Sequence, residues 1–174
     1  VSFDIAPIDY KRLLDFNMSI FSDAICAVLL SSPELKPNPI FRLQGVATEV
    51  FSEKELADET GNIGRVYKAA ERLLANVGLD RQSAQTHSLA TINTIENFTK
   101  FHAHILGVPP AQVVAATLKS HGHMMGCDCF VNLKAIIDGE CPNIPRQVLL
   151  YSSGRSESAL MVRVGFEGDE TGKV

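Results

Sequence analysis

The chain has 174 residues, of which 45% are hydrophobic and 21% charged, and its formal net charge is −4 at pH 7. These values describe one globular domain of ordinary size with enough apolar side chains for a core. The acidic balance and the lack of a basic, aromatic cluster argue against nucleic acid as a partner, and the lack of a long apolar run argues against a membrane span.

The first predicted element is a long helix from Pro7 to about Ser31, where apolar residues recur at helical spacing. Its second half is apolar nearly all round, so we expect it to be buried. The proline-rich stretch Ser32 to Pro39 ends it. The next segment, Ile40 to Phe51, fits either a short strand or an irregular crossing segment.

Two helices are expected next. Ser52 and Glu55 have capping-box spacing and predict a short helix that ends near Thr60. A second helix should run from Ile63 to Val77, because its apolar residues follow helical spacing and Gly78 is a typical stop.

The middle of the chain predicts two antiparallel helices. Apolar spacing indicates a helix from Leu89 to Leu106, ended by Gly107. Proline at 109 and 110 would open the next helix, whose apolar face carries Val114, Leu118, His121 and Met125.

Four of the five histidines lie in this region. On the predicted helices His102 and His121 belong to apolar stripes, whereas His104 and His123 face elsewhere. Because His102 and His121 would be separated by roughly 10 Å along the hairpin, they cannot bind one ion together. We therefore expect these histidines to be structural or solvent-facing unless a cofactor is present.

The cysteines pose a similar choice. The run from His121 and His123 to Cys127 and Cys129 contains soft metal ligands, but its spacing differs from that of zinc fingers, so a structural role is favoured. We expect Cys26, in an apolar run, to resist thiol reagents and the other two to react faster. Free thiols favour a reducing, cytoplasmic compartment.

The end of the chain changes character. Helical spacing continues from Phe130 to Asp138, and alternating patterns then predict strands from Gln147 to Tyr151 and from Ala159 to Phe166. We expect one helical domain over residues 1–166, with a terminal β-hairpin at 146–166 and a flexible tail at 167–174.

Motifs of known enzyme classes are missing from the sequence. We find no phosphate-binding glycine loop, no nucleophile elbow and no helical Glu-x-x-His pair. A non-enzymatic protein is therefore the expectation.

The order of helices between Gly61 and Ser120 resembles the globin superfamily, in which a haem-ligating histidine precedes a Gly-Val-x-Pro turn, here Gly107 to Pro110. The resemblance implies haem as cofactor. It implies His102 as the axial iron ligand, because His102 follows Phe98 by one turn, with His104 as the alternative. His121 and Met125 would lie on the other side of the haem.

Two functional hypotheses follow. The first is a mainly α, globin-like, non-enzymatic ligand-binding or sensory domain that holds haem. The second is an assembly module with structural histidines. In the second case the terminal hairpin pairs with another chain, as a homo-oligomer or with a partner, because a lone hairpin cannot bury its apolar face.

Overall fold

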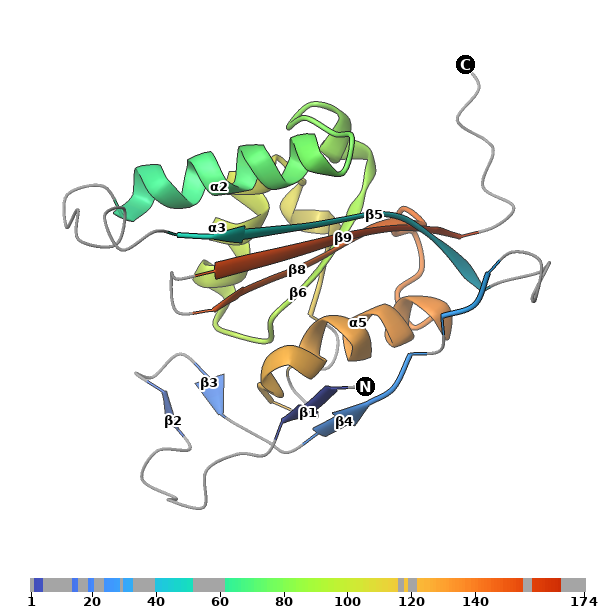
Figure 1. Cartoon of the computed structure of the whole chain (residues 1–174). Helices are drawn as coiled ribbons and strands as arrows, with labels where there is room; N and C mark the ends of the chain where they lie inside the picture. Colours follow the sequence, from blue (N-terminus) through green and yellow to red (C-terminus); the bar gives the residue numbers. More distant parts are fainter. Residues whose placement is uncertain are drawn as a thin grey trace.

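The computed structural model describes residues 2–4, 14–15, 19–20, 24–28, 30–32, 40–51, 62–115, 118, 122–154 and 158–166. At its centre lies a mixed five-stranded sheet with the order β5-β9-β8-β6-β7 (Figure 1). The strands are β5 (Phe41–Val50), β6 (Ser88–Thr91), β7 (Val113–Val114), β8 (Gln147–Gly154) and β9 (Ser158–Phe166). The first three strands in this order are antiparallel, and β6 pairs in parallel with both β8 and β7.

Helices cover both faces of this sheet, and the alternation of the strands explains how. In β8, Leu149 and Tyr151 belong to the core under α2 (Asn62–Asn76) and α3 (Glu96–Leu106). Their neighbours Val148 and Leu150 belong to the core under α5 (Asp128–Ile137). Successive strand residues point to opposite faces, so an almost continuous apolar run serves two cores.

The prediction of a mainly α bundle is wrong, and the segment Leu89 to Leu106 shows why. Residues 88–91 form β6, which is buried throughout, and α3 begins only at Glu96. The apolar spacing that predicted a helix here is spread over different elements: Leu89 lies in β6, Ile92 and Ile95 lie in the loop after it, and Phe98 lies in α3. A strand of four residues is too short to show a periodicity of its own, so the helical spacing prevailed in the prediction. Over residues 110–114 the expected second helix is replaced by the 3-10 turn η4 (Pro110–Gln112) and strand β7, and residues 116, 117 and 119–121 of that prediction lie outside the described residues.

Of the other predicted helices, two are confirmed, one is wrong and one lies outside the described residues. The helix at 63–77 is confirmed as α2, and the helical pattern after Phe130 is confirmed within α5. The long N-terminal helix is wrong where the structure describes it, because β1 (Ser2–Asp4) pairs with β4 (Ala24–Cys26), and β2 (Leu14–Asp15) with β3 (Ser19–Ile20). The predicted helix at 52–60 and the tail at 167–174 lie outside the described residues.

The terminal strands form the predicted antiparallel pair, but in an unexpected place. β9 lies between β8 and β5, and β8 lies between β9 and β6, so this pair is the middle of the sheet. Both of its edges are therefore hydrogen-bonded within the chain. The segment at 40–51, for which two alternatives were open, supplies the edge strand β5. Association of the chain with a second copy or with a partner chain stays a prediction.

In the described part of the chain, no helix has the length and apolar character needed to cross a membrane.

Candidate active site

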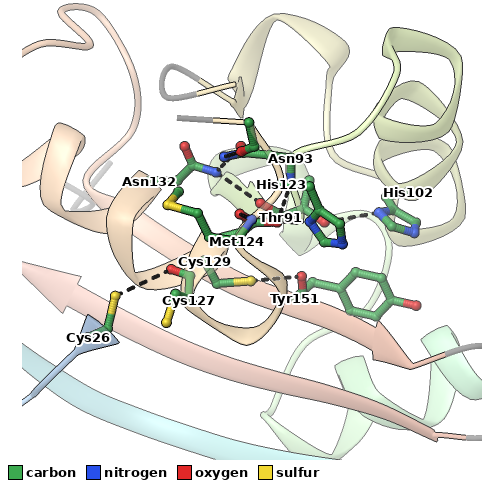
Figure 2. Close-up of polar contacts among 12 residues, drawn as sticks. Cys26, Thr91, Asn93, His102, His123, Met124, Cys127, Cys129, Asn132 and Tyr151 are labelled. Atoms are coloured by element: carbon green, nitrogen blue, oxygen red, sulfur yellow. Dashed lines mark hydrogen bonds and ion pairs between the residues drawn. The ribbon is translucent and has the colours of Figure 1, made fainter. Parts of the chain in front are cut away.

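The functional side chains gather where β6 ends and α5 begins (Figure 2). Thr91 is the last residue of β6, and Asn93 follows it in the loop that leads to α3. Asp128 opens α5, and Asn132 follows one helical turn later, so these two side chains share one face of the helix. All four residues are almost completely buried. Such a buried polar cluster is costly unless its members satisfy one another.

Asp128 is the centre of the cluster. Its Oδ1 atom accepts a hydrogen bond from the backbone N–H of Met124 at 2.7 Å. Its Oδ2 atom accepts one from the backbone N–H of Asn93 at 2.8 Å, and it also contacts Nδ1 of His123. The position in the first turn of α5 is favourable for a negative charge. The carboxylate therefore joins the loop after β6, the segment before α5 and the helix itself.

The two asparagines extend this network to the sheet. Asn132 donates from Nδ2 to the backbone carbonyl of Thr91 at 2.9 Å and to Oδ1 of Asn93 at 3.0 Å. Asn93 in turn donates from its own amide to the carbonyl of Gly122 at 2.9 Å. Because both amides are bonded at several atoms, the site has one fixed arrangement.

His123 is the member of the cluster that reaches the surface, with its side chain 16% exposed while that of Asp128 is fully enclosed. A carboxylate accepts hydrogen bonds, so Nδ1 of His123 carries the hydrogen and the lone pair of the neutral ring lies on Nε2. A histidine oriented by a buried carboxylate in this way can take up and return a proton at Nε2.

His102 lies next to this site and is more deeply buried than His123. Its ring is 1% exposed and packs edge-on against Phe98 and Tyr151, with centroid distances of 4.7 and 5.0 Å. Its Nδ1 atom lies 3.0 Å from Oγ1 of Thr91. Burial lowers the pKa of His102 from 6.5 to about 4, so the ring is neutral at pH 7.

The thiols near the site are enclosed, which corrects the expectation that Cys127 and Cys129 react readily. Both are buried, whereas Cys26 is partly exposed, and all three are thiols outside any disulfide. Cys129 donates from Sγ to the carbonyl of Tyr151 at 3.2 Å. Burial, helped by the nearby charge of Asp128, raises the pKa of Cys129 to about 12, so this thiol is not a nucleophile at neutral pH.

The remaining predicted site residues do not join this cluster. His104 is exposed on α3 and packs against Tyr67, with 5.8 Å between the ring centroids. His121 lies outside the described residues, and Met125 begins the 3-10 turn η5 (Met125–Cys127). Among the described residues, no three histidine, cysteine or acidic side chains are grouped so that they could hold a metal ion.

No model of a known protein family matches the chain, and no curated protein matches it. Solved structures do. OleA from Xanthomonas campestris is 16% identical over 77% of this chain and 40% of its own, with a TM-score of 0.59. The 3-oxoacyl-(acyl carrier protein) synthase III, FabH, from Pseudomonas aeruginosa is 13% identical over 71% and 44%, with a TM-score of 0.52. CsyB in complex with CoA-SH is 11% identical over 74% and 41%, with a TM-score of 0.57.

The chain thus spans less than half the length of these structures. At such low identity the likeness establishes the fold alone, which is α/β as in these structures, and the predicted globin resemblance is wrong. The predicted haem and haem-based sensing are wrong with it. The predicted axial ligand His102 is instead enclosed by Thr91, Phe98 and Tyr151. The alternative of an assembly module receives no support from these neighbours.

Sequence reasoning missed this cluster. It did not single out Thr91, Asn93, Asp128 or Asn132, and it expected His123 to be structural or solvent-facing, whereas His123 contacts the buried Asp128. One signal was available, because Asp128 and Asn132 are spaced by four residues beside the apolar positions Leu133 and Ile136. Polar residues on the buried face of a helix mark a site more often than exposed ones do.

Proposed function

We propose that the protein binds an acyl thioester and transfers its acyl group to a nucleophile. His123 is the acid–base residue and Asp128 the residue that positions it. The observation that carries the proposal is the contact of a partly exposed histidine with a fully buried carboxylate at the start of α5. The fold around this pair is shared with an acyl carrier protein-dependent synthase and with a protein solved in complex with CoA-SH.

Acyl transfer from a thioester needs a group that accepts a proton when the nucleophile attacks and returns it when the thiolate leaves. As the nucleophile attacks the carbonyl carbon of the thioester, Nε2 of His123 takes its proton. When the carbon–sulfur bond breaks, the same proton passes from Nε2 to the leaving thiolate. In the interval the ring is positively charged, and the carboxylate of Asp128 stabilises it.

Thioesters are the favoured substrate class because acyl carrier proteins and coenzyme A both carry acyl groups on a thiol. The nucleophile is left unassigned. Cys129, one of the two thiols that flank Asp128 in the sequence, is a poor candidate because burial raises its pKa to about 12.

The test is binding followed by turnover. Purified protein is titrated with CoA and with octanoyl-CoA in a calorimeter, and release of CoA from octanoyl-CoA is then followed by chromatography with water or hydroxylamine as acceptor. His123→Gln should keep binding but lower the release rate by about 100-fold or more. His104→Gln, which changes an exposed histidine on α3, is the matched control and should behave like the unaltered protein.

The outcomes separate the two parts of the proposal. Binding of octanoyl-CoA with equal release rates for the unaltered and His123→Gln proteins would reject the acid–base role and keep the ligand class. Failure of both CoA and octanoyl-CoA to bind would reject the ligand class as well.

A further inference from the structure

Three buried polar atoms at another place in the sheet have no hydrogen-bond partner within the described chain: Nε2 of His87, Oε1 of Gln147 and Nε of Arg163. Buried polar atoms in folded proteins nearly always have a partner, because an unpaired one loses its hydrogen bonds to water without replacement. Three of them together therefore need one shared explanation.

The strand register places these residues side by side. Ser88 lies opposite Val148, so His87, one residue earlier, lies beside Gln147. Gln147 pairs with Gly165, and Arg163 comes two residues before Gly165 on the same strand. Side chains at paired positions, and at positions two apart, point to the same face of a sheet. All three side chains therefore lie on the face that α2 covers.

A second observation supports this closeness. The pKa of His87 is lowered to about 4, mainly by burial and secondly by the positive charge of Arg163. Arg163 also donates from Nη1 to the carbonyl of Val77 at 3.4 Å, at the end of α2.

Gly165 makes the polar arrangement sterically possible. A Cβ atom at this position would clash with Nε2 of Gln44 and would lie 2.9 Å from both amide atoms of Gln147. Gln44 is the extra residue of the bulge in β5, between Leu43 and Gly45. A bulge re-aims the side chain that it carries. The absence of a side chain at position 165 thus leaves room for polar groups over β9.

The donor and acceptor pattern identifies the missing partner. Nδ1 of His87 lies 3.2 Å from the carbonyl oxygen of Ser83, which can only accept, so Nδ1 carries the hydrogen and Nε2 is an acceptor. Oε1 of Gln147 is a second acceptor, and Nε–H of Arg163 is a donor. An anion does not fit, because two of the three atoms are acceptors and would repel it. A cation does not fit either, because the guanidinium of Arg163 is positively charged. A water molecule has two hydrogens and a lone pair to offer, which matches all three atoms.

We propose that His87, Gln147 and Arg163 hold one buried water molecule, which donates to the histidine and the glutamine and accepts from the arginine. This water connects the start of β6 with the antiparallel pair of β8 and β9, which lies about 60 residues later in the sequence. It belongs to the folded protein whether or not the acyl-transfer proposal holds.

The experiment counts long-lived water. Oxygen-17 relaxation dispersion of the whole protein in labelled water should show one long-lived molecule fewer in His87→Phe than in the unaltered protein. Gln85→Met, at an exposed glutamine of the neighbouring turn, should leave the count unchanged. Equal counts in the unaltered and His87→Phe proteins would overturn the proposal.

A second measurement needs no variant. In the unaltered protein, a rotating-frame Overhauser cross-peak should join water to the Nε hydrogen of Arg163 and to the Hε1 hydrogen of His87. Absence of both cross-peaks, or a high-resolution crystal structure in which Arg163 donates directly to Gln147, would show that the atoms are satisfied without water.

Discussion

The backbone N–H of Asn93 donates to Oδ2 of Asp128 over 2.8 Å, and this bond ties the loop after β6 to the first residue of α5. The two residues are 35 positions apart in the sequence. Because Oδ1 of the same carboxylate accepts from Met124, the two oxygens of Asp128 hold two separate loops in place.

Asp128→Asn should therefore destabilise the fold. One carboxylate oxygen becomes an NH₂ group, so one of the two backbone N–H groups faces a donor in a buried site. We expect a loss of about 2–4 kcal/mol in the free energy of unfolding, measured by urea denaturation.

Asp138→Asn is the control for this experiment. Asp138 forms an exposed ion pair with Lys134 one helical turn away. Its loss should change the free energy of unfolding by less than about 1 kcal/mol. Equal losses for the two variants would contradict the role of Asp128 given above.

Acid should destabilise the protein through two buried histidines. The pKa values of His87 and His102 are both lowered from 6.5 to about 4. Between these values the unfolded chain binds protons at both rings and the folded chain does not. The free energy of unfolding therefore falls as the pH drops from 6.5 to 4, by up to about 3 kcal/mol for each ring. Above pH 6.5 these rings add no pH dependence.

Urea titrations at several pH values measure this loss, and nuclear magnetic resonance of the rings identifies its source. The carbon shifts of His87 and His102 should stay those of neutral imidazole at pH 5.5. Protonation of either ring near pH 6.5 in the native state would contradict the prediction for that residue.

Cys26, Cys127 and Cys129 should react with iodoacetamide in the reverse of the order expected from sequence. Cys26 and Cys141 are partly exposed and should be modified first, while Cys127 and Cys129 should be protected until the protein unfolds. Pulsed labelling followed by mass spectrometry of the peptides gives the order directly. Rapid native labelling of Cys129 would mean that the start of α5 opens easily.

Three glycine-to-alanine changes should have three different effects. Gly107 has a φ of 76°, and a Cβ atom there would lie 2.5 Å from the carbonyl oxygen of Arg81, so Gly107→Ala should cost more than about 2 kcal/mol. Gly139 has a φ of 78° with open space around it, so only the backbone strain of about 1 kcal/mol applies. Gly64, inside α2 and in open space, should become more stable by about 0.5–1 kcal/mol as alanine.

Thermal and urea denaturation of the three variants measure this ranking. The comparison carries its own control, since the chemical change is the same at each position. A stabilised Gly107→Ala protein would contradict the end of α3 as described.

The sequence by itself determined the elements whose signal is local. The helix α2 combines a one-sided apolar pattern with a glycine stop at Gly78, and the end of α3 at Gly107 needs only a residue that tolerates positive φ. The strand β8 is a short apolar run and β9 alternates, and the residues between them are polar, so both strands could also be predicted.

Only the tertiary structure decided the fold class and the site. Residues 88–91 become a strand because their parallel partner β8 begins about 60 residues later and covers an edge that the sequence cannot reveal. The same pairing carries Thr91 to α5, where Asn132 meets it from 41 positions away. A strand of four residues such as β6 is too short to show its own periodicity, so its long-range hydrogen bonds to β8 and β7 decide between strand and helix.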